Sequence, residues 1–297
     1  RSCGISSHTH THTHTQNKKR NFNMLSCLTP KKNTIHRKKE EKKMGQPVTI
    51  GHAAEFFRVS DQVSEKMNQR QQENITTERI VLPWNKSKIA FKVRNVLTPE
   101  ECQALIKASE SGDGYERALL NIGGGRQIMD TDYRDSYRVM IDHPRLSTAI
   151  YDKTIGNNIT LKNGLGELNN GFANIVPVEL NERLRFLKYY IGQKFSMHCD
   201  GSYTRPSNHV HKGDRSYFTI LIYLNKDYKG STRLFSGHNE GAEYYDVIPE
   251  EGMVFVHQHD ILHAGMDIKS GTKYCIRSDI MCRFVKSNEK TNKNIFF

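Results

Sequence analysis

The string RFLKYYIGQKFSMHCDG, residues 185–201, contains the residue pair on which the fold assignment rests. His198 and Asp200 are separated by one residue, with Phe195 before them and Gly201 after. On an extended strand, residues two apart point to the same face roughly 6 to 7 Å from each other. The imidazole and the carboxylate therefore converge while Cys199 points away, which is an arrangement suited to binding a metal ion.

A third candidate ligand is His263, in the string HQHDILHAGM at residues 257–266. It completes the set if its strand pairs close to the strand of His198. Two histidines and one carboxylate on one side of a metal leave its other positions open, which is typical of non-haem Fe(II) oxygenases. His257 and His259 share a face at strand spacing and remain alternatives to His263.

Two cations follow these candidate ligands. Lys273 lies ten residues after His263, and Arg277 lies four residues further on. Fe(II) held by two neutral imidazoles and one carboxylate keeps one positive charge, so a dianionic co-substrate needs one further cation beside it. At strand spacing Lys273 and Arg277 share a face but lie about 13 Å apart, so only one of them can bind that anion. Lys273 is the preferred candidate, and Arg277 is the alternative.

Five strings resemble the prolyl 4-hydroxylase-like branch of the 2-oxoglutarate- and Fe(II)-dependent dioxygenases. They are YYIGQKFSMHCDG, DRSYFTILIYLN, KGSTRLF, VIPEEGMVFVHQHDILHAG and GTKYCIRSDIM. The resemblance extends over residues 95–284 and is strongest from Arg185 onward. Its motifs are specific in combination rather than singly.

The resemblance implies a role for each motif residue. His198, Asp200 and His263 would hold Fe(II), and Lys273 would bind the distal carboxylate of 2-oxoglutarate. The other residues at co-substrate positions are Tyr189, Thr219, Tyr223 and, as the alternative to Lys273, Arg277. No catalytic residue beyond the metal ligands is implied.

The reaction implied by the resemblance is hydroxylation of a substrate with O2, releasing succinate and CO2, with L-ascorbate as the reductant. A prolyl residue in a protein is the most familiar target of this family, but the substrate itself stays open between proteins and small molecules. Asp200 favours hydroxylation over halogenation, because related halogenases carry a small residue at that position. The alternatives are a non-catalytic binding module of the same fold and a nucleic-acid-directed oxygenase.

The implied fold is mainly β with flanking helices, built on a double-stranded β-helix core of the jelly-roll, cupin-like type. RSYFTILIYLN at 215–225 predicts a buried strand, and residues 52–74 predict an amphipathic helix. Thr98, Pro99 and Glu101 predict a capped helix start. ELNERLRFLKYY at 179–190 is expected to pass from polar helix to strand. Residues 123–127 and 201–214 are expected to be loops, the second acting as a lid.

The sequence divides into five expected parts. They are a basic tail at 1–43, an N-terminal extension at 44–94, the N-terminal helical part of the dioxygenase fold at 95–180, the catalytic core at 181–286, and a C-terminal tail at 287–297.

The tail at 1–43 carries most of the positive charge. It holds eleven Lys or Arg and two Glu, a net charge of nine out of the chain's twelve. Such a tail could attract nucleic acid, but a solvated tail is the preferred interpretation and nucleic-acid binding is not expected. The run HTHTHTHT and the opening Arg1 suggest that residues 1–43 are partly or wholly the conceptual translation of an untranslated region. In that case Met24 or Met44 would be the true start.

The cysteines and apolar segments bear on the compartment. Six cysteines show no pairing pattern, and Cys102, Cys199, Cys275 and Cys282 are expected to be core thiols in a reducing environment. No apolar run has transmembrane length, and no retention signal stands at the end. Cytosol or nucleus is therefore the expected location, while the oligomeric state stays open.

Overall fold

The computed structural model describes residues 41–43, 50–70, 74–111, 114–123, 126–168 and 173–286. The predictions about the basic tail, the start at Met24 or Met44 and the C-terminal tail lie outside these residues, apart from residues 41–43. Among the helices described, none is long and apolar enough to cross a membrane.

The larger of two facing sheets forms the scaffold. Its antiparallel order is β2 (Thr76–Arg79), β3 (Ala90–Arg94), β15 (Val254–Gln258), β11 (Arg215–Tyr223), β18 (Lys273–Lys286), β9 (Arg183–Tyr189), β7 (Tyr137–Asp142) and β4 (Glu116–Arg117). β8 (Ala173–Leu180) pairs with the outer half of β18. Thr76–Arg79 and Ala90–Arg94, which were expected in an N-terminal extension, thus form the last two strands at one end of this sheet.

The smaller sheet lies on the other side of the core. Its order is β10 (Phe195–His198), β16 (His263–Gly265), β13 (Thr232–Phe235) and β14 (Tyr244–Val247). Two small sheets complete the strands: β1 (Glu41–Lys43), β6 (Arg126–Ile128) and β5 (Leu120–Asn121), and the pair β12 (Tyr228–Lys229) and β17 (Ser270–Gly271). Two facing antiparallel sheets confirm the predicted double-stranded β-helix.

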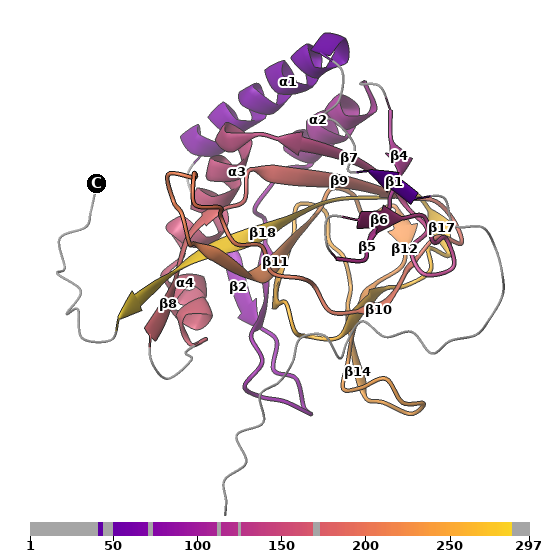
Figure 1. Ribbon diagram of the computed structural model, residues 1–297. Coiled ribbons are helices and arrows are strands. Elements are labelled where there is room, and N and C mark those ends of the chain that lie inside the picture. The colour runs from indigo at the N-terminus through magenta and orange to yellow at the C-terminus, as the bar shows by residue number, and fades with distance from the viewer. Residues whose placement is uncertain are drawn as a thin grey trace, which may run out of the picture.

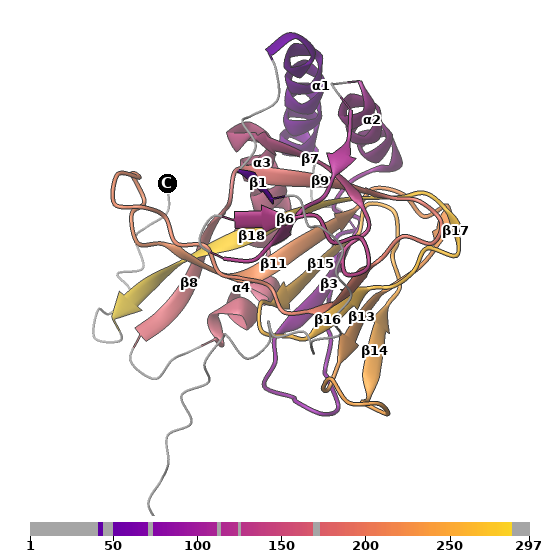
Figure 2. The same cartoon turned by 45° about the vertical axis from the view of Figure 1, so that its right-hand side comes forward.

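The helices cover the outer face of the large sheet. They are α1 (Ile50–Gln69), α2 (Pro99–Glu110), α3 (Pro144–Tyr151), the π-helix Asp152–Gly156 and α4 (Ile159–Gly166). Figures 1 and 2 show α1, α2 and α3 on one side of this sheet, with β13, β14 and β16 on the other. The predicted start of α2 is confirmed, because Thr98 and Glu101 form a reciprocal capping box with Pro99 in the first turn.

Alternation along β18 separates the two cores. Tyr274, Ile276 and Ile280 pack into the core beneath the helices, whereas Cys275 packs into the core between the sheets. A strand places successive side chains on opposite faces, so Lys273 lies on the face of Cys275. This predicted alternation is confirmed, and it directs Lys273 into the interior of the β-helix.

Two local predictions are wrong. The polar segment at Glu179 is not helical, because Glu179 and Leu180 end β8 and pair with Met281 and Ile280 of β18. The segment at Arg126 is not wholly loop, because residues 126–128 form β6 between β1 and β5. In both cases pairing with a distant strand overrides the local composition.

Candidate metal and co-substrate site

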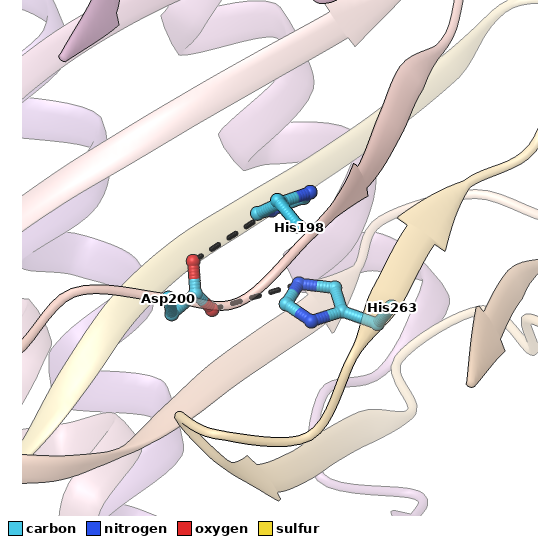
Figure 3. Close-up of side chains that lie close together, drawn as sticks. All are labelled: His198, Asp200 and His263. Carbon is cyan, nitrogen blue, oxygen red and sulfur yellow. Dashed lines mark ion pairs between the residues drawn. The ribbon is translucent and has the colours of Figure 1, made fainter. Parts of the chain in front are cut away.

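Strand pairing brings the two predicted histidines together. In the smaller sheet His198 of β10 lies opposite His263 of β16, and Asp200 follows β10 with its amide donating to the His259 carbonyl at 2.9 Å. One ligand atom from each of His198, Asp200 and His263 lies within 4.8 Å of the others. Figure 3 shows the Asp200 carboxylate facing both imidazoles, with one oxygen toward each ring. Oδ1 lies 3.8 Å from His198 Nε2, and Oδ2 lies 3.6 Å from His263 Nε2.

Both imidazoles are held in one tautomer by the backbone. His198 Nδ1 lies 2.7 Å from the Ser196 carbonyl, and His263 Nδ1 lies 2.9 Å from the Ile261 carbonyl. A carbonyl can only accept, so each Nδ1 carries the proton and each Nε2 offers its lone pair to the cluster. Burial, together with the neighbouring His263, lowers the pKa of His198 to about 3, so that ring is neutral at physiological pH.

Asp200 is fixed by two donors. Arg277 Nη2 lies 2.8 Å from Oδ1, and the Thr219 hydroxyl donates to Oδ2 at 2.5 Å. Burial raises the pKa of Asp200, but Arg277 and the surrounding histidines outweigh this effect and hold it well below the usual value. Asp200 is therefore a carboxylate, which is the form that binds a metal. Thr219 thus lies at Asp200, and Arg277 already has a carboxylate partner.

The two alternative histidines take different places. His257 Nε2 lies 3.8 Å from Asp200 Oδ2, and its ring centroid lies 4.4 Å from that of His263. His259 points to Asp279, with Nε2 3.7 Å from Oδ1. Of the three, His263 joins the compact cluster with His198 and Asp200. His257 borders that cluster with a buried Nε2 that has no hydrogen-bond partner.

Lys273 is a buried cation surrounded by aromatic rings. Its Nζ lies 5.4 Å from the ring centroids of Tyr189 and Tyr223 and 5.9 Å from that of Tyr228. The side chain is buried, which lowers its pKa, and no carboxylate of the described chain pairs with it. The Tyr228 hydroxyl is also buried without a partner. An ammonium and a hydroxyl left unpaired together could receive the oxygens of a carboxylate.

Sequence reasoning missed Tyr228 at this site. The segment NKDYKGS at residues 225–231 has the composition of a turn, and its aromatic residue carries no periodicity that would place it inside. Tyr228 of β12 pairs with Gly271 of β17, which lies two residues before Lys273 in the sequence. Only this contact between distant segments brings its ring close to Lys273.

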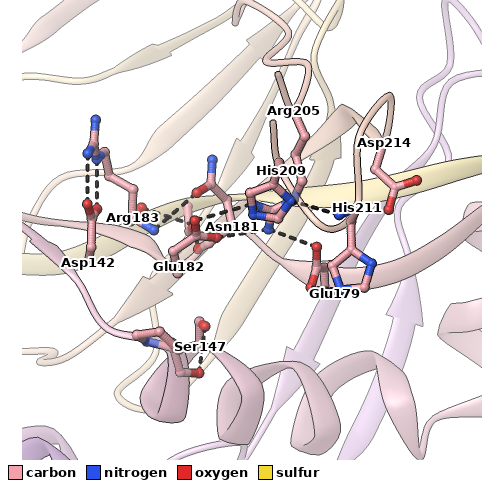
Figure 4. Close-up of polar contacts among 12 residues, drawn as sticks. Asp142, Ser147, Glu179, Asn181, Glu182, Arg183, Arg205, His209, His211 and Asp214 are labelled. Carbon is pink, nitrogen blue, oxygen red and sulfur yellow. Dashed lines mark hydrogen bonds and ion pairs between the residues drawn. The ribbon is translucent and has the colours of Figure 1, made fainter. Parts of the chain in front are cut away.

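The loop at 201–214 is anchored at its middle and its end. The Arg205 guanidinium is buried and lies 2.8 Å from carboxylate oxygens of both Glu179, near the end of β8, and Glu182, in the turn that leads to β9. At the end of the loop, Arg283 of β18 holds Asp214 through two hydrogen bonds. Figure 4 shows Arg205 and His209 above the turn that carries Glu182. The role of this loop as a lid stays a prediction.

Comparison with known proteins gives matches that agree with this site. Residues 184–278 match the model of the 2OG-Fe(II) oxygenase superfamily. A curated protein of Acanthamoeba polyphaga mimivirus, named as a candidate prolyl 4-hydroxylase, is 24% identical over 207 residues, covering 65% of this chain and 72% of its own length.

Solved structures of similar proteins include two prolyl hydroxylases. The viral collagen prolyl hydroxylase of Paramecium bursaria Chlorella virus-1 is 18% identical, with 65% of this chain and 95% of that chain covered and a TM-score of 0.40. A Pseudomonas putida prolyl 4-hydroxylase is 15% identical, with 76% and 100% covered and a TM-score of 0.39.

Proposed function

Because this chain belongs to the 2OG-Fe(II) oxygenase superfamily through residues 184–278, we propose that His198, Asp200 and His263 bind its Fe(II). We further propose that Lys273 binds the distal carboxylate of 2-oxoglutarate. The chain is thus a dioxygenase that uses Fe(II) and 2-oxoglutarate.

The donor set fits Fe(II). Two Nε2 lone pairs and one carboxylate meet within 4.8 Å, and the second nitrogen of each imidazole is occupied by a backbone carbonyl. This is the two-histidine, one-carboxylate set that leaves metal positions open for other ligands. The convergence of these lone pairs on Asp200 is the observation that carries the proposal.

The surroundings of Lys273 fit a dianionic co-substrate. A buried ammonium without a carboxylate partner costs free energy, and a bound anion would remove that cost. Tyr189 and Tyr223 enclose the ammonium, so a carboxylate bound there would be shielded from water. We propose that the Tyr228 hydroxyl donates to the same carboxylate. Arg277 is the weaker candidate, because Asp200 lies 2.8 Å from it.

When bound, Fe(II) and 2-oxoglutarate supply the oxidation of a substrate C–H bond by O2, with an alcohol, succinate and CO2 as the products. The residues of the chain bind and orient. Arg277 and Thr219 fix the carboxylate of Asp200, and the backbone keeps the proton of each imidazole on Nδ1. The ring of Phe195 stacks on His198 with centroids 3.7 Å apart and covers that side of the site.

The first substrate to test is a prolyl residue, because the mimivirus relative is named as a candidate prolyl 4-hydroxylase. We also propose L-ascorbate as the reductant that keeps the iron as Fe(II). We propose a cytosolic or nuclear location, because Cys102, Cys275 and Cys282 are buried free thiols.

The test is succinate formation by the purified chain, prepared without metal and supplied with Fe(II), 2-oxoglutarate and ascorbate. Turnover should require iron and should vanish in His198→Ala. If turnover is absent in both proteins, calorimetric titration of 2-oxoglutarate into the Mn(II)-loaded chain decides the outcome. Binding of 2-oxoglutarate would support a dioxygenase that turns over only when its own substrate is present, whereas no binding would refute the proposed site.

A further inference from the structure

The guanidinium of Arg134 has no carboxylate partner among the described residues and lies beside the candidate iron ligands. Its guanidinium carbon lies 4.6 Å from the centroid of the Phe195 ring, and that ring stacks on His198 with an interplanar angle of 23°. An isolated bridge between Arg134 and Phe195 fixes this approach. One aromatic ring therefore separates the cation from a proposed ligand of the metal.

The edge of Arg134 that is best suited to a carboxylate is not used by the protein. Its Nη1 lies 3.5 Å from the Leu119 carbonyl, whereas its Nε is buried without a hydrogen-bond partner. Nη2 donates no hydrogen bond to the part of the chain that the structure describes. The Nε and Nη2 groups form the side of the guanidinium that donates two parallel hydrogen bonds to a carboxylate.

The same edge is occupied in three other arginines of this chain. Each donates from Nε and Nη2 to the two oxygens of one carboxylate, at distances between 2.7 and 3.0 Å. The pairs are Arg183 with Asp142, Arg233 with Asp246, and Arg283 with Asp214. Arg134 differs from them in lacking a carboxylate partner, although it is half-buried and lies beside the site.

The charges around Arg134 also favour an anion. Burial lowers its pKa to about 10, and Arg138, Arg277 and Arg185 add to this shift by repulsion. Arg134 is still a cation at neutral pH. The nearby carboxylates are already engaged, since Arg277 pairs with Asp200 and Arg185 pairs with Asp279. A half-buried cation that lies among other cations is stabilised when an anion from outside the chain binds to it.

We propose that Arg134 binds a carboxylate of the substrate, and that the substrate is a small carboxylic acid or amino acid hydroxylated close to that group. This inference rests on the proposed function, because it takes His198 to mark the position of the metal. A carboxylate on the free edge of Arg134 brings the carbons a few bonds away from it near His198. An internal residue of a polypeptide lacks a main-chain carboxylate, so a free acid fits this site better.

Paramagnetic broadening in NMR tests the inference without turnover. The chain is loaded with Mn(II) and 2-oxoglutarate under nitrogen, and two matched pairs of probes are added: propionate with propionamide, and trialanine with its C-terminal amide. We expect propionate to be broadened at least about fivefold more than propionamide. In Arg134→Gln this difference should disappear.

Arg145→Gln is the matched control, because Arg145 pairs with Asp61 and Glu65 on α1 at the surface. It should keep the preference for the acid. Equal broadening of acid and amide in the unsubstituted chain, or an unchanged preference in Arg134→Gln, would overturn the inference. Preference for trialanine over propionate would overturn the small-acid assignment and point to a peptide C-terminus.

Calorimetry of 2-oxoglutarate separates this inference from the proposed function. If 2-oxoglutarate does not bind to the Mn(II)-loaded chain, the proposed function fails. If it binds but Arg134→Gln weakens it about tenfold, Arg134 belongs to the co-substrate and the inference alone fails. Binding within twofold of the unsubstituted chain, with the acid preference lost, is the result expected for a substrate contact.

Discussion

Arg277 Nη2 lies 2.8 Å from Oδ1 of Asp200, so the carboxylate proposed to bind iron is already held by a guanidinium from the central strand of the large sheet. This contact restricts the rotation of Asp200 and keeps it ionised. It also means that Arg277 and Lys273 differ in kind, because one has a carboxylate partner in the chain and the other has none.

Replacing Arg277 by Gln should weaken metal binding about 10- to 100-fold, the usual cost of losing a residue that orients a metal ligand. The pKa of Asp200 should rise, because Arg277 is the largest influence that lowers it. Protons then compete better with the metal, so the loss should be greater at about pH 6 than at about pH 7.5. Titration of Mn(II) followed by EPR measures both effects, and Arg277→Lys should restore part of the pH behaviour. A loss of affinity that does not depend on pH would contradict this role.

Lys273→Ala should raise the dissociation constant of 2-oxoglutarate about 10- to 100-fold, because a hydrogen bond to a charged group contributes about 1.5–3 kcal/mol. Calorimetry on the Mn(II)-loaded chain under nitrogen gives the value. Lys269→Ala is the control, since its side chain is 71% exposed and its partner Asp267 lies on the surface. If Arg277→Gln weakens 2-oxoglutarate more than Lys273→Ala does, the assignment of the two cations has to be reversed.

Acid should destabilise the metal-free chain through its buried histidines. His143 accepts a hydrogen bond from the Leu146 amide at 3.2 Å, and burial lowers its pKa below the usual value. The unfolded state therefore takes up the proton first, at about pH 6.5, so the stabilising effect is complete above that pH and is lost as the pH falls.

Urea unfolding at about pH 7.5 and about pH 5.5 measures this effect. In His143→Gln, which keeps an acceptor at this position, the fall in the free energy of unfolding should be smaller by about 1 kcal/mol. His238 is exposed, so His238→Gln is the control and should retain the full pH dependence of the free energy of unfolding. If the free energy of unfolding falls equally in His143→Gln and in the unsubstituted chain, groups other than His143 account for the loss of stability in acid.

Gly252→Ala should destabilise the fold by about 2–4 kcal/mol. Gly252 has a φ of 74°, and an added Cβ would lie 2.1 Å from the carbonyl oxygen of Leu97. That carbonyl cannot retreat freely, because the Val96 and Leu97 amides both donate to the Gly252 carbonyl. Thermal unfolding against Gly166→Ala, whose Cβ would have only ordinary contacts, isolates the effect. Similar midpoints for the two variants would refute it.

Features that depend on the local spacing of residues could be predicted from the sequence. The alternation of β18 and the capping box at Thr98 follow from spacing and residue type, and both are confirmed. The spacing of His198 and Asp200 indicated a shared site, and the register of β10 with β16 places His263 beside it. The binding roles of these residues stay predictions.

What local reasoning could not supply depends on contacts between distant segments. Tyr228 reaches Lys273 through pairing of two very short strands, and Arg134 reaches His198 only through Phe195. Glu179 extends β8 because the outer half of β18 is there to pair with it. Composition near each of these residues resembles a turn, a surface strand or a polar helix, so the signal lies in the tertiary arrangement.

A single strand, β18, carries both Lys273 and Arg277, and its hydrogen bonds to β9 and β11 fix the register. An insertion or deletion of one residue between the two cations would turn one of them out of the interior. The separation along β18 between Lys273, proposed to bind the co-substrate, and Arg277, which holds Asp200, can therefore change only in steps of two residues. Divergence toward new substrates is accordingly expected in the segments that hold Arg134 and the loop at 201–214, where length can vary without disturbing this spacing.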